Sequence, residues 1–346
     1  MKKVLILQPY EDQAKAIAKF LKSHSKDFTV VGGVMDDKEY FPYIPFFDKI
    51  VKVTPDFSIE EKNYDIIVPT GAQSTHALLS AKKSIRIGNI SFDQNNLQVF
   101  EKIPFLAIVQ GLGVPIPDSY QNADDIKEFP VFFKQQFEKG ANQRGIIHTR
   151  AELEDISSDV PLFFQEYIDS VGNYDVGFLA RDGEILTTFM HNALYNWPKP
   201  GGSGVVLRTY YNERILEYTS RILKNMKYNG WGLVQFKYCH KRKDFVFMEV
   251  NAKFWASIEF AFLNNPAFLK ELFGIHYEMK KVDCIVFCNR LANYGLIQYV
   301  QLMIRFSSCY KLYIKDSIKI LSFRLLPESG KKIVRKLLAL SKVRFQ

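Results

Sequence analysis

Two neighbouring stretches of sequence decide the fold. Residues 230–237 read GWGLVQFK and residues 247–255 read FMEVNAKFW. The second stretch alternates polar with apolar positions, which is typical of a β-strand, and the short polar segment between the stretches predicts a hairpin. Alternation places Glu249 and Asn251 on one face of the second strand. Gln235 on the first strand can lie opposite Glu249, so carboxylate and amide oxygens are expected around one point.

The residues that flank this polar cluster predict that it is sheltered from solvent. Val246-Phe247 and Phe254-Trp255 are strongly apolar, which makes a merely solvated polar strand face the weaker interpretation. Magnesium prefers oxygen ligands in octahedral geometry, usually together with substrate phosphates. The sequence therefore predicts a Mg²⁺ or Mn²⁺ site beside the cation Lys253, and the predicted metal ligands are Gln235, Glu249 and Asn251.

At these spacings the sequence resembles the ATP-grasp superfamily, especially the branch that includes the carbamoyl phosphate synthetase large chain. In that branch a Gln, a Glu fourteen residues later and an Asn two residues further hold two metal ions. Gln235, Glu249 and Asn251 stand at those spacings. The next basic residue of the motif, usually Arg, contacts phosphate, and here it is Lys253. The resemblance implies catalytic roles for Asn251 and Lys253.

Other parts of the resemblance imply the ATP contacts. Residues 129–134 resemble the family strand whose Lys binds phosphates, and Glu101-Lys102 resembles the motif that supplies a second phosphate contact. Residues 140–145 resemble the small loop that closes over the phosphates and offers them backbone N–H groups. Residues 164–168 resemble the hinge that reads adenine. The implied ATP-binding residues are Lys102, Lys134, Gly140, Ala141, Gln165, Glu166, Tyr167 and Ile168.

Arg208 completes the implied catalytic set. It follows the stretch Gly201-Gly202-Ser203-Gly204, which resembles a Gly-containing family motif. The resemblance implies that Arg208 contacts the transferred phosphate or the substrate carboxylate, since a guanidinium matches the geometry of either group.

The first third of the chain reads as a parallel sheet with helices on both faces, because strand-like and helix-like segments alternate along it. A long helix is expected over residues 95–112, closed by Gly113 and two prolines. The other expected elements are strand 4–7, helix 12–21, strands 28–34, 50–53 and 65–69, and helix 75–82.

The second unit differs because its strands pair as hairpins, one of them through the turn signal Asp182-Gly183. We therefore expect three parts. An α/β parallel-sheet domain over residues 1–112 resembles the pre-ATP-grasp domain. An α+β ATP-grasp domain follows over residues 113–285, with a lid subdomain at 115–170. A helical, basic C-terminal extension covers residues 286–346.

The resemblance implies a ligase that uses ATP and Mg²⁺ to convert a carboxylate into an acyl phosphate, which an amine or ammonia then attacks. Small-molecule carboxylate and amine substrates are expected, from surface-glycan or small-metabolite biosynthesis. Two alternatives stay open: an ATP-binding module without ligase activity, and an ATP-grasp kinase that transfers phosphate to a final acceptor. A homodimer also stays open.

Charge is unevenly distributed along the chain. Residues 289–346 contain 12 Lys+Arg and 2 Asp+Glu, whereas the remainder contains 34 and 35. We therefore predict no nucleic-acid partner, since the body is neutral and no reading motif accompanies the tail. Residues 317–326 and 331–340 read as amphipathic helices, which either dock on an anionic membrane surface or pack on the enzyme.

The remaining features predict a cytoplasmic protein. If the tail docks on a membrane, the protein would associate with the inner face of that membrane. The four cysteines form no CxxC pair, and reduced, buried thiols are expected. No apolar run reaches the length of a transmembrane helix.

Overall fold

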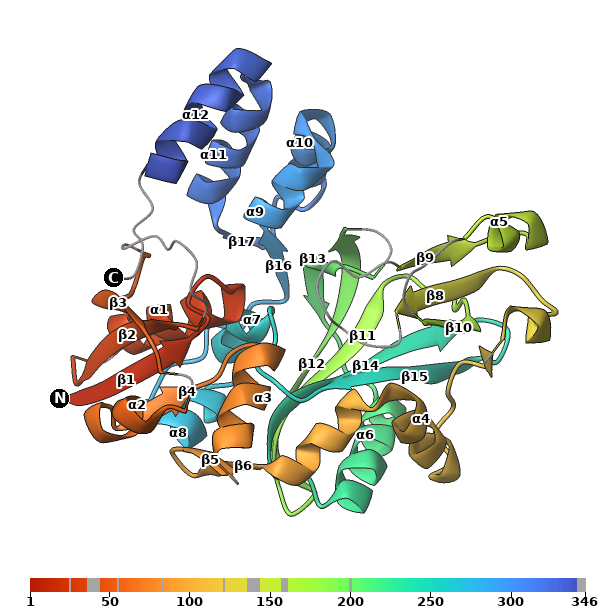
Figure 1. Cartoon of the computed structure of the whole chain (residues 1–346), viewed down its shortest axis with the longest axis horizontal. Coiled ribbons are helices and arrows are strands. Elements are labelled where there is room, and N and C mark those ends of the chain that lie inside the picture. Colours follow the sequence, from red (N-terminus) through yellow and green to blue (C-terminus); the bar gives the residue numbers. More distant parts are fainter. Residues whose placement is uncertain are drawn as a thin grey trace.

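The computed structural model describes the chain in nine stretches and shows two α/β units side by side, with helices at one end (Figure 1). The described residues are 1–24, 26–35, 44–54, 56–82, 84–120, 122–135, 144–156, 161–198 and 201–340.

The first unit is built on a parallel sheet, as the alternating pattern predicts. Its four strands lie in the order β3-β2-β1-β4. They are β1 (Lys2–Leu7), β2 (Phe28–Val34), β3 (Lys49–Lys52) and β4 (Ile66–Val68). The strands are connected by α1 (Asp12–His24) and α2 (Ser58–Asn63), and α3 (Ala72–Ala81) follows β4. Most apolar side chains of these strands are buried because helices cover the sheet.

The helix expected over residues 95–112 is divided in two, so that expectation is wrong in part. A 3₁₀ helix, η1 (Gln94–Phe100), is separated from α4 (Lys102–Gly111) at Glu101, whose backbone leaves helical geometry. Pro104 gives the physical reason. A proline lacks the N–H that would bond to the carbonyl of Phe100 in a continuous helix, and its ring would collide with that carbonyl.

A hairpin of β5 (Ser84–Ile87) and β6 (Ile90–Asp93) joins the first unit to the second. Phe92 on β6 is fully buried, and its ring centroid lies 4.8 Å from that of Trp231 in the second unit. Buried residues of both units belong to one continuous hydrophobic cluster. The two units therefore share a core.

The lid subdomain is a small antiparallel sheet with its own core. Its strand order is β7-β10-β8-β9. The strands are β7 (Ser119–Tyr120), β8 (Val131–Gln135), β9 (Arg144–Ile147) and β10 (Leu162–Glu166), accompanied by η2 (Ala123–Asp125) and α5 (Arg150–Glu154). Phe133 and Phe164 are among the side chains that fill its separate hydrophobic cluster.

The central sheet of the second unit has seven strands in the order β15-β14-β11-β12-β13-β16-β17. Asp182-Gly183 forms the predicted turn between β11 and β12, with positive φ at both residues. The strands are β11 (Asn173–Arg181), β12 (Glu184–Trp197), β13 (Ser203–Thr209), β14 (Gly230–Cys239), β15 (Asp244–Asn251), β16 (Cys284–Phe287) and β17 (Tyr310–Leu312). The unit also contains α6 (Glu213–Met226), α7 (Ile258–Asn264) and α8 (Ala267–Phe273).

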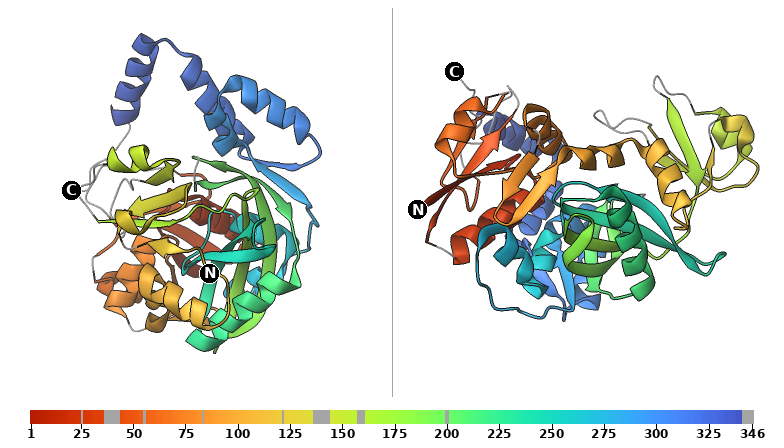
Figure 2. Two further views of the ribbon diagram at one scale, coloured as in Figure 1. Left: turned by 90° about the vertical axis from the view of Figure 1, so that its right-hand side faces the viewer. Right: turned by 90° about the horizontal axis from the view of Figure 1, so that it is seen from below.

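The C-terminal segment is not purely helical, because β16 and β17 extend the central sheet. Short helices α9 (Cys288–Leu291) and η3 (Ala292–Tyr294) pack beside them. Three longer helices, α10 (Leu296–Arg305), α11 (Ile314–Leu325) and α12 (Glu328–Leu340), project from the body (Figures 1 and 2). None of the helices in the described stretches is both long and apolar enough to span a membrane.

A disulfide corrects the expectation of four reduced cysteines. Cys284 on β16 and Cys309, just before β17, form a disulfide with their Cα atoms 4.8 Å apart. The strands β16 and β17 are adjacent and parallel, so the helices between them bring the chain back beside β16. Cys239 and Cys288 are free and buried, as expected.

Burial of Cys288 has a consequence for stability at high pH. Burial raises the pKa of its thiol from 9.0 to about 11, because desolvation disfavours the thiolate. The thiol therefore ionises at lower pH in the unfolded chain, and its contribution to folding stability should fall as the pH rises from 9.0 to about 11. We expect Cys288→Ala to flatten the pH dependence of the free energy of unfolding in this window, as measured by urea titration. An unchanged slope would contradict this assignment.

Candidate functional site

Four adjacent strands of the central sheet carry polar side chains in one row. Asp175 on β11 pairs with His191 on β12 and with Gln235 on β14. Gln235 in turn pairs with Glu249 on β15, so their predicted opposition is confirmed. Directly paired residues project from the same face of a sheet. The four side chains therefore lie side by side.

Hydrogen bonds join the centre of this row into a cluster. The Nδ2 atom of Asn251 donates to Glu249 Oε1 at 2.9 Å and to Gln235 Oε1 at 3.3 Å. The Nε2 atom of Gln235 donates to Asp175 Oδ1 at 2.9 Å. The structure thus brings the three predicted metal ligands within contact of one another.

Asp175 and His191 extend the cluster beyond the residues predicted from the sequence. Both are almost fully buried. His191 Nε2 lies 3.2 Å from Asp175 Oδ2 and 3.1 Å from Ser257 Oγ. These contacts fix Asp175 beside Gln235. In the sequence, Asp175 comes directly before the apolar run of β11. A single acidic residue at that point is the signal that could have identified Asp175.

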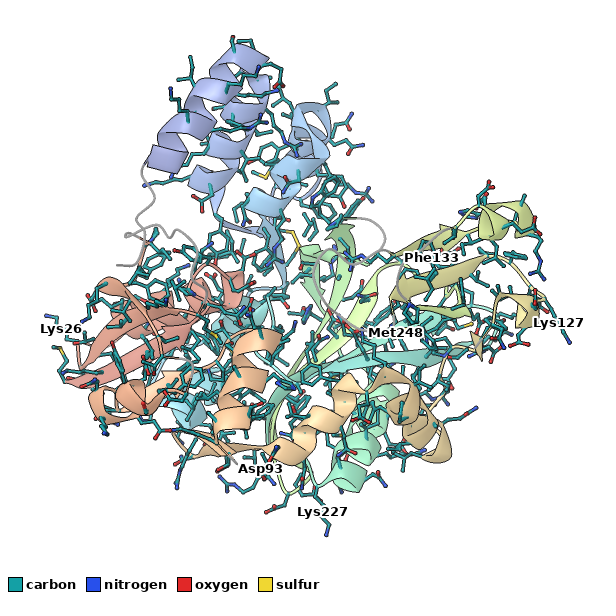
Figure 3. All side chains as sticks on the ribbon, in the orientation of Figure 1. Lys26, Asp93, Lys127, Phe133, Lys227 and Met248 are labelled. Carbon is teal, nitrogen blue, oxygen red and sulfur yellow. A yellow bond between two sulfur atoms is a disulfide. The ribbon has the colours of Figure 1, made fainter. Side chains whose placement is uncertain are left out.

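A cavity of 530 Å³ separates this cluster from the lid sheet. Met248 on β15 lines it; Figure 3 labels this residue on the central sheet and Phe133 on the lid. Among the described residues, four cationic ones line the cavity: Lys102, Lys134, Arg144 and Lys237. The predicted residues on its lining are Lys102, Lys134, Gln165, Glu166, Tyr167, Ile168, Gln235 and Glu249.

The two predicted phosphate contacts come from different elements. Lys134 lies on β8 of the lid, with its Nζ atom 5.8 Å from the ring centroid of Phe163 on the neighbouring strand. Lys102 is the first residue of α4. The two lysines line one cavity, Lys134 from the lid and Lys102 from α4. An anion bound between them would therefore contact both the lid and α4.

The end of β10 and the residues that follow it place polar atoms on the cavity wall. Gln165 is almost fully buried, and its Oε1 atom has no hydrogen-bond partner among the described residues. A buried acceptor on a cavity wall favours a ligand that donates a hydrogen bond. Next to it, burial raises the pKa of Tyr167, and its backbone N–H donates to Pro130 O at 3.3 Å.

Lys237 is a lining residue that the sequence analysis did not single out. Its Nζ atom donates to the backbone carbonyl of Ile168 at 3.3 Å and lies 5.4 Å from the ring centroid of Tyr167. Burial lowers the pKa of this ammonium group. Lys237 follows Gln235 by two residues on β14, so the same alternation that predicted the metal cluster could have found it.

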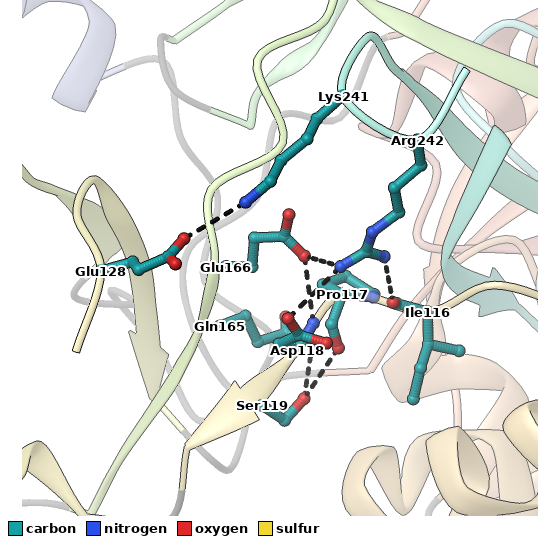
Figure 4. Close-up of polar contacts among 9 residues, drawn as sticks. All are labelled: Ile116, Pro117, Asp118, Ser119, Glu128, Gln165, Glu166, Lys241 and Arg242. Atoms are coloured by element: carbon teal, nitrogen blue, oxygen red, sulfur yellow. Dashed lines mark hydrogen bonds and ion pairs between the residues drawn. The ribbon is translucent and has the colours of Figure 1, made fainter. Parts of the chain in front are cut away.

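Glu166 contacts the body rather than only the cavity (Figure 4). Its carboxylate forms an ion pair with Arg242, in the turn between β14 and β15, and accepts a hydrogen bond from the backbone N–H of Asp118 at 3.3 Å. Arg242 also donates to Ile116 O at 2.8 Å, and the neighbouring Lys241 pairs with Glu128 at 3.3 Å. Through Arg242 this turn fastens the lid to the central sheet, whereas the Lys241–Glu128 pair is largely exposed.

Removing the Arg242 contacts should loosen the lid. We expect Arg242→Ala to raise the KM for ATP by roughly tenfold, because the hinge would lose an ion pair and a backbone hydrogen bond worth about 1–3 kcal/mol. Steady-state ATP kinetics would measure the change, with the exposed Lys241→Ala as the matched control, expected to stay within about twofold. Equal KM values for all three proteins would rule out a fastening role for Arg242.

The remaining predicted residues are placed differently. Arg208 pairs with Asn192, and the next residue, Thr209, pairs with His191, so Arg208 projects from the opposite face to the cluster. It lines an adjoining cavity of 1190 Å³, which shares Val171, Leu194 and Tyr195 with the first. Lys253 is half-buried two residues beyond the end of β15. Gly140 and Ala141 lie outside the described residues.

No protein-family model and no curated protein matches the sequence. Solved structures do match the fold. The N5-carboxyaminoimidazole synthase of Aspergillus clavatus, in complex with ADP and an aminoimidazole ribonucleotide, has a TM-score of 0.58 at 11% identity over 81% of this chain and 78% of that one. The L-amino acid ligase of Bacillus licheniformis has a TM-score of 0.50 at 13% identity, over 75% and 69%.

A third match is the pyruvate carboxylase of Rhizobium etli, with a TM-score of 0.56 at 15% identity over 74% of this chain. This chain spans only 28% of the length of that carboxylase. All three are ATP-grasp proteins. At these identities the likeness establishes the fold, and the chain has the ATP-grasp fold that the resemblance in sequence predicted.

Proposed function

We propose that this chain is a ligase that uses ATP and a divalent cation to activate a carboxylate as an acyl phosphate and to join it to an amine or ammonia. One observation carries the proposal. Gln235 and Glu249 line a cavity together with Lys102 and Lys134, and Asn251 donates hydrogen bonds to both Gln235 and Glu249.

The donor set fits Mg²⁺ or Mn²⁺ provided that phosphates take part. Within the described ranges, no group of three His, Cys, Asp or Glu side chains is arranged to hold a metal ion. Mg²⁺ is usually bound through one or two carboxylates with substrate phosphates completing its shell. Glu249 supplies a carboxylate, and Gln235 and Asn251 supply amide oxygens. We therefore infer that metal and nucleotide bind together.

Two groups of lining residues suit ATP. The unpartnered Oε1 of Gln165 is an acceptor for an amino group such as that of adenine, and Ile168 also lines the cavity. Lys102 and Lys134 line the same cavity and would neutralise phosphate charge, which is the main requirement of phosphoryl transfer. ATP, when bound, would supply the phosphoryl group that activates the carboxylate.

Water must be kept from an acyl phosphate, since it hydrolyses readily. The lid sheet covers the cavity, and the ion pair of Glu166 with Arg242 holds it against the central sheet. This contact gives Glu166 a positioning role. The likeness in fold to an L-amino acid ligase and to an N5-carboxyaminoimidazole synthase supports the ligase class for this chain.

Product analysis tests the proposal. The full chain would be incubated with ATP, Mg²⁺ and a panel of carboxylates, with hydroxylamine present to trap acyl phosphates as hydroxamates. We expect ATP-dependent hydroxamate formation with at least one carboxylate. ATP binding without turnover would instead favour a binding module, and a stable phosphorylated acceptor would favour a kinase.

A further inference from the structure

Helices α10, α11 and α12 expose most of the large apolar side chains on the surface of the described residues. Nine of the 17 exposed large hydrophobic residues fall between residues 296 and 333, and all nine are aliphatic. Isolated exposed apolar side chains are common, but a concentration of them marks an interaction surface. We call this set the apolar tail surface; it consists of Leu296, Ile297, Val300, Ile304, Ile314, Ile318, Leu325, Leu326 and Ile333.

The apolar side chains form a stripe on α10. Ile297, Val300 and Ile304 are spaced by three and four residues, so they share one helix face. Their side chains are 75%, 46% and 70% exposed. The opposite face of α10 packs inward, since Tyr299 and Met303 contact the hydrophobic cluster that contains Val286 of β16. The apolar side chains of the exposed stripe therefore do not contribute to the packing of α10 on the body.

Helix α11 repeats this arrangement. Ile314, Ile318 and Leu325 are 44%, 57% and 69% exposed and lie on one face, which borders the buried side chains of Ser317 and Leu321. Tyr299 OH and Ser317 Oγ lie 2.8 Å apart and fix α11 to α10. The two stripes thus belong to one structural block.

The charges beside the stripes are mainly positive. Between Leu296 and Leu340 the chain has nine Lys+Arg and two Asp+Glu. Both acids are paired with lysines, Asp316 with Lys319 at 3.8 Å and Glu328 with Lys331 at 2.9 Å. The exposed basic residues are Arg305, Lys315, Lys319, Arg324, Lys332, Arg335 and Lys336.

The geometry points to an anionic lipid bilayer as the occupant of the apolar tail surface. Aliphatic side chains flanked by lysine and arginine on short amphipathic helices are the requirement for binding in the plane of a charged interface. The helices project from one end of the body, where a flat surface can reach them (Figure 2). A second copy of the chain would bring two basic surfaces together and oppose their association.

The consequence is a peripheral enzyme whose catalytic unit is anchored to the membrane through its own sheet. The disulfide between Cys284 and Cys309 and the pairing of β16 with β17 tie the helices to the central sheet that carries Glu249. Docking of the tail surface would therefore fix the position of the cavity relative to the bilayer. This inference does not depend on which reaction the cavity performs.

Vesicle sedimentation of the full chain tests the inference. We expect binding to vesicles of phosphatidylcholine with phosphatidylglycerol, little binding to phosphatidylcholine alone, and weaker binding at high salt. Two double variants should each lower the partition coefficient by roughly tenfold or more. They are Ile297→Glu with Ile304→Glu, and Lys315→Glu with Lys319→Glu.

Matched controls separate the tail surface from general effects. Leu186→Glu with Met279→Glu alters exposed apolar residues elsewhere, and Lys26→Glu with Lys127→Glu alters exposed lysines on the two sides of the body (Figure 3). Both controls should bind like the unaltered chain, and all variants should unfold at the same urea concentration. Three outcomes would overturn the inference: no binding to anionic vesicles, equal loss in the controls, or self-association that the Ile297→Glu with Ile304→Glu variant abolishes without any lipid binding.

Discussion

Glu249→Gln is expected to lower the kcat of ATP turnover by about a thousandfold, equivalent to roughly 4 kcal/mol of transition-state stabilisation. The substitution keeps the size of the side chain and removes its negative charge. Glu249 Oε1 accepts from Asn251 at 2.9 Å, so a neutral amide would disturb the cluster and weaken any bound cation. The measurement is steady-state ATP turnover at saturating Mg²⁺.

A matched control shows whether the loss of turnover is specific to the polar cluster. Glu184→Gln alters a carboxylate that is exposed and paired with Lys224 on the surface, and it should leave kcat within about twofold. A variant at Glu249 that turned over ATP as fast as this control would remove the metal-site assignment.

Phe92→Ala is expected to have the largest effect on stability, a loss of about 3–5 kcal/mol in the free energy of unfolding. Phe92 is fully buried and packs on Trp231 and Tyr228 at ring-centroid distances of 4.8 and 6.0 Å. Because this contact joins the first unit to the central sheet, both units should lose stability together.

Urea unfolding followed by circular dichroism and by tryptophan fluorescence would check this expectation. Phe46→Ala is the control, since Phe46 also lies in the first unit but is 41% exposed, and its loss should cost less than about 1 kcal/mol. Separate unfolding transitions for the two units in the Phe92→Ala protein, with the second unit unchanged, would contradict a shared core.

Local patterns in the sequence were sufficient to predict much of the fold. The bounds of α6 follow from local signals, because Asn212 caps its start and Lys227 takes a left-handed conformation after its end. The hairpin that sets Gln235 against Glu249 follows from strand alternation alone. Both features depend on neighbouring residues, which a sequence displays directly.

The features that the sequence analysis missed depend on long-range register. Asp175 joins Gln235 because β11 lies next to β14, although 60 residues separate them. Arg208 projects away from the cluster, because β13 pairs with β12 in the register that sets Thr209 opposite His191 and Arg208 opposite Asn192. The disulfide likewise depends on the crossover between β16 and β17. No local pattern encodes such pairings.

Binding of Mn²⁺ followed by electron paramagnetic resonance, with and without a non-hydrolysable ATP analogue, tests the central claim most directly. Gln235, Glu249 and Asn251 should hold the ion only when nucleotide phosphates complete its shell. We therefore predict tight Mn²⁺ binding in the presence of the analogue, weak binding in its absence, and loss of the nucleotide-dependent binding in Glu249→Gln. Nucleotide-dependent binding of Mn²⁺ that is equally tight in both proteins would contradict the account.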